Sequence, residues 1–163
     1  MPGFLRRLQG LFTEGPPNFS EVLENIAASG LPSQPWHIRF LVSKGVSAIV
    51  SLTEKPLPKR LVENMGIKYF HFPLEDHMPA DPHELLKIVN TVDRLVEDGH
   101  KVLIHCMAGY GRTGMVLAAY IMKKKGLGWM ESLEKTRRIR PGSVEKNQEK
   151  TLQEFETIVR AGS

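Results

Sequence analysis

The stretch of sequence that decides the fold reads His105-Cys106-Met107-Ala108-Gly109-Tyr110-Gly111-Arg112-Thr113-Gly114. It contains the only cysteine of the chain, six positions before an arginine. The residues from Lys101 to His105 are mostly apolar and partly β-branched, which is typical of a buried strand. No proline interrupts a helical pattern from Thr113 to Lys125, and Gly126 suits its end. The pattern therefore predicts a strand, a tight glycine-rich loop and the N-terminus of a helix.

Such a loop is suited to binding a phosphate group. Its backbone N–H groups can point inward, and the positive end of the helix dipole faces the same point. Glycines lack the Cβ that would block unusual φ angles or the close approach of a ligand. Arg112 adds a planar fork of donors that is always charged. We therefore expect phosphate to be held by six consecutive residues, Met107, Ala108, Gly109, Tyr110, Gly111 and Arg112.

Cys106 lies at the predicted floor of this loop. Inward N–H groups, a helix N-terminus and a guanidinium all stabilise a thiolate, and a thiolate beneath a bound phosphate is a nucleophile directed at phosphorus. Thr113 can donate its hydroxyl to the sulfur and stabilise it both at rest and as a leaving group. A lone cysteine is most often a buried small hydrophobe, but six further motif residues at fixed offsets argue against that interpretation here.

The rest of the chain predicts an α/β fold. Stretches of strand length at 46–52, 68–74 and 101–105 alternate with helical patterns at 34–44, 59–65, 82–97, 113–125, 129–139 and 143–159. Asp81 is expected to cap the helix at 82–97, and Ser143 the last one. This alternation predicts a mainly parallel central sheet flanked by helices, with ligand chemistry at the carboxyl ends of the strands.

The motif His-Cys-x5-Arg-Thr-Gly, at His105 to Gly114, resembles the signature of the cysteine-based protein tyrosine phosphatases, and the small atypical dual-specificity branch fits best. Segments that also look like that branch are Pro17-Asn18-Phe19-Ser20, Val50-Ser51-Leu52-Thr53-Glu54 and Arg140-Pro141-Gly142-Ser143-Val144. The resemblance implies a protein tyrosine phosphatase-like fold. It also implies a hydrolase that forms a cysteinyl-phosphate intermediate without a metal or cofactor.

Cleavage of a phosphoester also requires an acid that protonates the leaving oxygen. Glu75, Asp76 and Asp81 lie in a polar, proline-bearing connection, where mobile catalytic loops often sit, and Asp81 is assigned to the helix cap. The resemblance implies that the acid is an aspartate shortly after the strand that precedes the signature strand. This favours Asp76, with Glu75 as the alternative.

Supporting roles follow for several further residues. His105 could orient the loop through a backbone hydrogen bond or tune Cys106 electrostatically. The resemblance implies an amide near the start of the last helix that positions the hydrolytic water, which here is Gln148 or Asn147. A cluster of cations could form a basic rim for acidic substrates or simply a solvated helix end, and it consists of Arg137, Arg138 and Arg140.

Composition sets the remaining expectations. The chain has 163 residues, 41% of them hydrophobic, which suits one domain: we expect an N-terminal arm at 1–16 and a single phosphatase catalytic domain at 17–163. One cysteine excludes an internal disulfide and no segment has the length of a membrane span, so a cytoplasmic protein is expected. We also expect a monomer. The net charge of +4 permits nucleic acid, anionic lipid or phosphorylated protein as a partner.

The leading interpretation is a protein phosphatase that acts on phosphotyrosine and on phosphoserine or phosphothreonine. A phosphatase for inositol lipids is the first alternative, weakened because the loop contains no lysine. A phosphatase for RNA 5′ ends is the second alternative. This chain shows no interleaved aromatic and basic residues that would form a stacking platform, so nucleic acid is not expected as a partner. A rhodanese-type sulfurtransferase also uses a cysteine in an anion-binding loop, but its loop resembles this one poorly. A non-catalytic phosphate-binding adaptor should lack the cysteine, the arginine or the acid, and all three are present.

Overall fold

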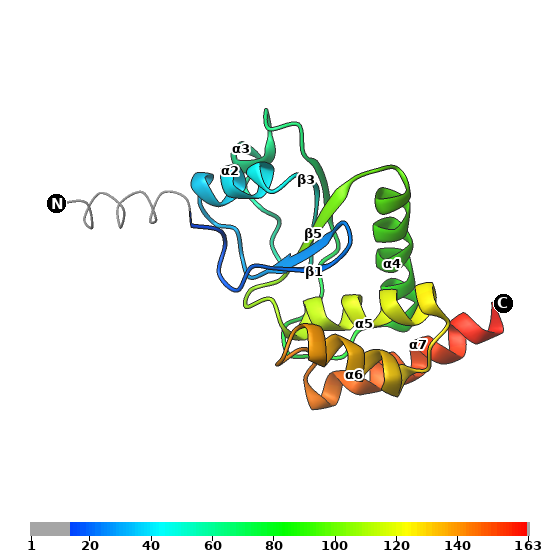
Figure 1. Cartoon of the computed structure of the whole chain (residues 1–163). Coiled ribbons are helices and arrows are strands. Elements are labelled where there is room, and N and C mark those ends of the chain that lie inside the picture. The colour runs from blue at the N-terminus through cyan, green and yellow to red at the C-terminus, as the bar shows by residue number, and fades with distance from the viewer. Residues whose placement is uncertain (1–13, 163) are drawn as a thin grey trace.

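A computed structural model of the protein describes residues 14–162. In this part of the chain, one sheet has the strand order β1-β2-β5-β3-β4. The pairs β2–β5, β5–β3 and β3–β4 are parallel, and β1 runs antiparallel to β2 (Figure 1). The strands are β1 Ser20–Leu23, β2 Ile26–Ser29, β3 Val46–Ser51, β4 Lys68–His71 and β5 Lys101–His105. The prediction of a mainly parallel sheet is confirmed, whereas the predicted N-terminal arm falls mostly outside the described residues and stays a prediction.

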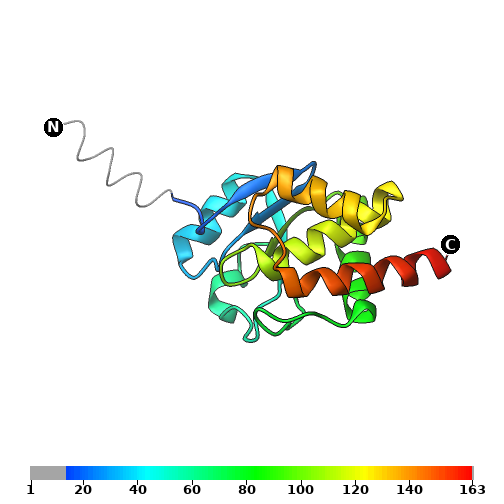
Figure 2. The ribbon, with the colours of Figure 1, turned by 90° about the horizontal axis from the view of Figure 1, so that it is seen from below.

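Helices cover both faces of the sheet. They are α2 Pro35–Ser43, α3 Lys59–Val62, α4 Pro82–Glu97, α5 Gly111–Lys125, α6 Trp129–Ile139 and α7 Glu149–Ala161, with a short 3₁₀ helix, η1, at Lys146–Gln148. The apolar residues of α2 and α3 form one core cluster with the sheet, and those of α4 to α7 form the other (Figure 1). Figure 2 shows α5, α6 and α7 side by side across the second face.

The central strand β5 explains why the motif at 105–114 starts at a fixed point. Successive side chains of a strand point to opposite faces. Val102 and Ile104 accordingly belong to the core beneath α4 to α7, while Leu103 belongs to the core beneath α2 and α3. All three are fully buried, as expected of a parallel strand covered on both faces. The strand ends at His105, so Cys106 begins the loop on a rigid support.

Several boundaries agree with the sequence prediction. The bounds of α4, β5 and α6 coincide with the predicted ones. Asp81 caps α4 as predicted, because its carboxylate accepts the N–H of His83 at 2.7 Å. Gly126 ends α5 with a left-handed φ of 65°, a conformation that glycine adopts without strain.

The start of the last helix was predicted wrongly. The helical pattern at 143–159 begins only at Lys146 as a 3₁₀ turn and at Glu149 as an α-helix. Val144 has a left-handed φ of 66°, which no right-handed helix accommodates. The Ser143 hydroxyl donates to the carbonyl of Arg140 at 2.7 Å instead of capping the helix. Two smaller differences are that α5 begins at Gly111 instead of Thr113, and that α3 ends at Val62 instead of Met65.

Strands β1 and β2 were missed. Each has four residues, and they are joined by a tight turn at Asn25, which has a φ of 64°. Strands this short carry too few positions to display an alternating pattern. They matter for the site because the segments beside them, at Asn18 and Gly30, contact the loop that follows β5.

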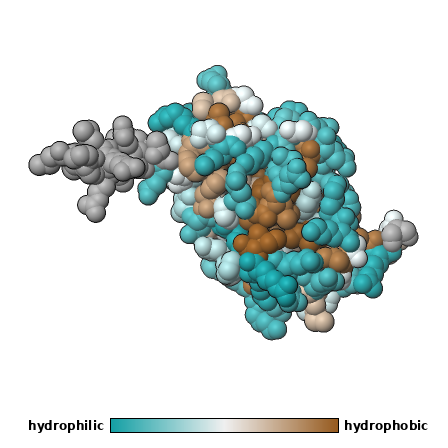
Figure 3. All heavy atoms as spheres, in the orientation of Figure 1, coloured by the Kyte–Doolittle hydropathy of each residue, from teal (hydrophilic) through white to brown (hydrophobic). Residues whose placement is uncertain are grey.

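The surface is largely hydrophilic on the face drawn in Figure 3, where polar side chains surround a central apolar area. Among residues 14–162, no helix combines the length and the apolar character needed to cross a bilayer.

Candidate active site

Cys106 is held at the floor of a loop that is built to bind an anion. Its side chain is 3% exposed. The sulfur accepts hydrogen bonds from the N–H of Gly109 at 3.2 Å and from the hydroxyl of Thr113 at 3.1 Å. Donors directed at sulfur stabilise the thiolate over the thiol. The predicted contact between Thr113 and Cys106 is therefore present.

The loop carbonyls are bonded on the outside of the loop. The N–H of Leu31 donates to the carbonyl of Met107 at 3.0 Å, and the Asn18 amide donates to that of Ala108 at 2.9 Å. In a trans peptide the carbonyl and the N–H of the same unit point in opposite directions. Outward carbonyls therefore turn the N–H groups inward, as the contact from Gly109 to the sulfur illustrates. This is the concave ring of donors that an anion requires.

Gly109 is required at its position for two reasons. Its φ of 89° lies in the left-handed region, where a side chain is strained. A Cβ there would lie only 2.5 Å from the carbonyl of Ser29 and 2.7 Å from the nitrogen of Gly30. The turn of the loop and its close packing on the end of β2 therefore both depend on this glycine.

Arg140 clamps the same loop from outside, a role that the sequence did not reveal. It is 5% exposed, and its Nε donates to the carbonyl of Gly109 at 2.8 Å. Its other nitrogens donate to the Ser20 hydroxyl and the Asn18 carbonyl, both at 2.6 Å. The guanidinium also lies 4.8 Å from the ring centroid of Tyr110. Burial lowers the pKa of Arg140, while Tyr110 and Cys106 oppose that shift.

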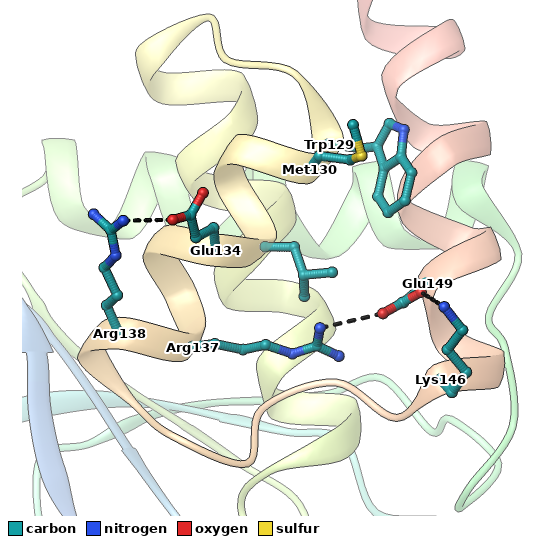
Figure 4. A pocket seen from close by; sticks show the side chains of 8 residues that line it. Trp129, Met130, Glu134, Arg137, Arg138, Lys146 and Glu149 are labelled. Atoms are coloured by element: carbon teal, nitrogen blue, oxygen red, sulfur yellow. Dashed lines mark hydrogen bonds and ion pairs between the residues drawn. The ribbon is translucent and has the colours of Figure 1, made fainter.

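The three arginines proposed for a basic rim are each engaged in contacts within the domain. Arg140 is buried in the clamp just described. Arg137 donates to the carbonyls of Ser143 and Val144 and lies 3.2 Å from Glu149. Arg138 pairs with Glu134 one turn earlier on α6 (Figure 4). Their charges are thus used in local contacts.

Arg112 lies in the first turn of α5, and its side chain is 1% exposed. Its Nη1 donates to the carbonyl of Leu74 at 3.0 Å and to the carboxylate of Glu54, and its Nη2 lies 3.2 Å from Asp76 Oδ1. The Nε of Arg112 is buried and has no hydrogen-bond partner among the described residues. An unpaired buried donor is costly, so a ligand oxygen at this position would remove the cost.

Glu54 was not predicted to contact this arginine. It follows β3, and its exposed carboxylate has a lowered pKa, chiefly because of its own backbone N–H and then because of Arg112. Its segment, 50–54, is one of those that resemble the family, but nothing in the spacing indicates a contact with Arg112. The contact arises because β3 and β5 are neighbours and end at the same edge of the sheet.

Asp76 is the predicted acid that reaches the loop. Within residues 14–162, the carboxylates within ion-pair distance of Arg112 are those of Asp76 and Glu54. Glu75 is exposed, and Asp81 is engaged as the cap of α4. The Asp76 side chain is 40% exposed, so it is open to a ligand in the loop as well as to water.

His105 supports the loop as a neutral residue. Its Nδ1 donates to the carbonyl of Cys106 at 3.1 Å, and its Nε2 accepts from the Ser51 hydroxyl. Burial, opposed in part by the bond to the Cys106 carbonyl, lowers the pKa of His105 to about 4. Of the two predicted roles, orientation through a backbone hydrogen bond is therefore the one that the geometry supports.

Gln148 lies against the loop, as expected of an amide near the last helix. It is fully buried and accepts the N–H of Glu145 at 2.9 Å. A Cβ on Gly111 would lie 3.1 Å from Gln148 Oε1 and 3.2 Å from its Nε2. Asn147 points instead to the loop that carries Asp76, because its amide donates to the carbonyl of His77 at 2.7 Å.

The fold and the site define a class: a mainly parallel α/β domain whose buried cysteine lies in a loop suited to binding an anion. The family described as "Dual specificity phosphatase, catalytic domain" matches residues 32–158. The chain therefore belongs to the dual specificity phosphatase family, and the resemblance to cysteine-based protein tyrosine phosphatases is confirmed.

Relatives and solved structures agree with this membership. The chain is 29% identical to "Tyrosine-protein phosphatase CDC14" of Saccharomyces cerevisiae, over 69% of this chain and 21% of that protein. It is 32% identical to human "Dual specificity protein phosphatase 15", over 59% of this chain and 32% of that protein. The match thus spans about a fifth to a third of these relatives. The crystal structure of "Tk-PTP in the active form" superposes with a TM-score of 0.78 at 33% identity, covering 86% of this chain and 97% of that one.

Proposed function

We propose that the protein is a phosphoprotein phosphatase that hydrolyses phosphotyrosine, and phosphoserine and phosphothreonine as further substrates, through a cysteinyl-phosphate intermediate. The observation that carries the proposal is the environment of Cys106. Its sulfur accepts two hydrogen bonds inside a loop whose carbonyls are bonded outward, beside the buried guanidinium of Arg112. This arrangement supports a thiolate beneath a bound phosphate.

In the first step the Cys106 thiolate attacks phosphorus, and the bond between phosphorus and the leaving oxygen breaks. Asp76, which contacts Arg112 at 3.2 Å, gives its proton to that oxygen. The backbone N–H groups of the loop and the guanidinium of Arg112 stabilise the charge on the equatorial oxygens.

In the second step water attacks the phosphorus of the cysteinyl phosphate and gives a proton to the Asp76 carboxylate. The bond between sulfur and phosphorus breaks, and inorganic phosphate and the Cys106 thiolate are released. Thr113, which donates to the sulfur, stabilises this leaving group. The position of Gln148 against Gly111 supports a role in orienting the water.

A groove beside the loop supports a phosphoprotein as the substrate. Its volume is about 420 Å³, and Met107 of the catalytic loop lines it together with Leu31, Leu57 and Pro58. Peptide residues that flank a phosphorylated side chain need such a surface, whereas an inositol headgroup needs cations instead. The loop itself contains no lysine. The proposal includes a reducing, cytoplasmic compartment, because a lone catalytic thiolate is vulnerable to oxidation.

A phosphopeptide panel tests this function against its alternatives. We expect turnover of phosphotyrosine peptides and of a chromogenic aryl phosphate, both abolished by Cys106→Ser. The same panel should include a phosphoinositide and an RNA with a 5′ triphosphate. Faster turnover of either of these than of every phosphopeptide would contradict the proposal. Phosphate binding without any turnover would favour an adaptor.

A further inference from the structure

The loop that carries Asp76, residues 75–80, is tied to a distant segment, residues 145–151. The Asn147 amide donates to the carbonyl of His77 at 2.7 Å, and the Gln148 amide donates to that of Met78 at 3.4 Å. The hydroxyl of Thr151 accepts the N–H of Ala80 at 2.9 Å and donates to the carbonyl of the same residue at 3.1 Å. These contacts fix the backbone of the acid loop.

The side chain of His77 adds a contact of another kind. Its Nδ1 lies 2.6 Å from Glu145 Oε1, and its Nε2 lies 3.4 Å from Asp76 Oδ2. One ring thus faces the predicted acid on one side and the anchoring segment on the other. Both partners are carboxylates, so the ring attracts both of them, through a hydrogen bond to Glu145 and an ion pair with Asp76, only as an imidazolium.

The charged groups around His77 favour this protonated form. The hydrogen bond to Glu145 and the charge of Asp76 raise the pKa of His77 above its ordinary value of 6.5, while Arg112 opposes the shift. The raised pKa extends the protonated, bridging form of His77 to higher pH, and the bridge is lost as the pH rises through that raised pKa. Above it the neutral ring keeps one donor and can hold only one of the two carboxylates.

The backbone of His77 shows that contacts hold this residue in place. Its φ is 61°, in the left-handed region, which non-glycine residues adopt at a cost and keep only where the surroundings hold them. Its side chain is 74% exposed, so burial does not supply that support. Exposed ion pairs contribute little to global stability, so the consequence of the bridge is local.

We propose that His77 is a positioning residue for the acid: its imidazolium joins Asp76 to Glu145 and holds the 75–80 loop where Asp76 faces the phosphate site. The inference rests on the proposed role of Asp76. When the imidazolium loses its proton, the Asp76 side chain is no longer held by the bridge, although the backbone contacts of the loop remain. Turnover that depends on protonation of the leaving group then falls.

Two substrates and three variants test this role. Phenyl phosphate needs a proton on its leaving oxygen, whereas 2,4-dinitrophenyl phosphate does not. The variants are His77→Asn, Glu145→Gln and the control His83→Asn, which alters an exposed histidine in the first turn of α4. Asparagine tolerates the left-handed φ at position 77, and glutamine keeps an acceptor oxygen at position 145.

On phenyl phosphate we expect His77→Asn to lower kcat about tenfold near pH 6. The variant should also lack the fall in kcat at alkaline pH that deprotonation of His77 causes in the wild type. Glu145→Gln should move that fall to lower pH, because it removes the negative charge from the residue whose hydrogen bond is the largest cause of the raised pKa of His77. Turnover of 2,4-dinitrophenyl phosphate and the inhibition constant of inorganic phosphate should stay within about twofold. His83→Asn should match the wild type on both substrates.

An unchanged pH profile for both His77→Asn and Glu145→Gln, or an equal loss on the two substrates, would overturn the proposal. Asp76→Asn in the same assay separates this failure from failure of the proposed function. If Asp76→Asn abolishes the phenyl phosphate reaction while His77→Asn has no effect, the bridge is wrong and the acid assignment stands. If Asp76→Asn has no effect, the acid assignment itself is wrong.

Discussion

The carboxylate of Asp76 lies 3.2 Å from Nη2 of Arg112, although the two residues belong to different loops at the edge of the sheet. The same guanidinium donates to the carbonyl of Leu74, just before the acid. One buried arginine therefore joins the start of the signature helix to the loop that carries Asp76, the proposed acid. A phosphate bound at this arginine would lie beside Asp76, where the proposed mechanism needs a proton for the leaving group.

Asp76→Asn should lower kcat on phenyl phosphate and phosphoserine peptides by about 10²- to 10³-fold, because a positioned acid contributes this much. The loss should be small on 2,4-dinitrophenyl phosphate, whose leaving group departs without a proton. Glu75→Gln is the matched control, since Glu75 is exposed next to the acid. A larger effect of Glu75→Gln than of Asp76→Asn would transfer the role to Glu75.

Arg112→Lys should lower kcat/KM by about 10²-fold or more, because lysine keeps the charge but loses the planar pair of donors. Competitive inhibition by inorganic phosphate should weaken in parallel. Arg138→Lys, at an arginine that is 73% exposed and paired on α6, should leave both constants unchanged. Wild-type kinetics of Arg112→Lys would show that charge alone is sufficient at this position.

Gly109→Ala and Gly99→Ala form a matched pair. Their φ angles are 89° and 88°, so the backbone strain of a new Cβ is shared, at about 1–2 kcal/mol. A Cβ at position 99 meets nothing within 4 Å, whereas one at position 109 meets the Ser29 carbonyl at 2.5 Å. Urea unfolding should show the larger loss for Gly109→Ala, and only this variant should lose turnover. Equal losses would mean that the contact with β2 does not shape the loop.

The neutral state of His105 should make stability fall in mild acid. Its pKa in the folded protein is about 4, below the ordinary 6.5, so between these values the unfolded chain binds the proton more readily. The free energy of unfolding should therefore decrease as the pH falls from 6.5 to 4, by about 3 kcal/mol from this group. His105→Asn should reduce that slope in urea titrations. An unchanged slope would mean that the pKa of His105 does not differ between the folded and unfolded protein.

The sequence predicted the parts of the site that are close together in the chain. Cys106, Thr113 and Arg112 share one motif, and the strand and helix around them follow from local patterns. The bounds of α4 and α6 were also predictable, because a cap or a clear apolar period marks them.

The parts that were missed depend on contacts between distant segments. Arg140 reads as one more cation in a basic stretch, yet it binds the Gly109 carbonyl because the chain after α6 returns to the loop. The false start of the last helix has the same origin: Arg137 holds the Val144 carbonyl at 2.8 Å, and Val144 takes a left-handed φ that the helical pattern does not reveal.

The proposed mechanism is tested most directly by looking for a phosphate bound to the sulfur of Cys106. The enzyme is mixed with excess aryl phosphate, quenched in acid within one turnover, and digested for mass spectrometry. We expect one phosphate on the peptide that contains Cys106, no label in Cys106→Ser, and a label that accumulates in Gln148→Ala if this amide orients the water. A wild-type enzyme that releases phosphate while Cys106 stays unmodified at every quench time would contradict a cysteinyl-phosphate intermediate.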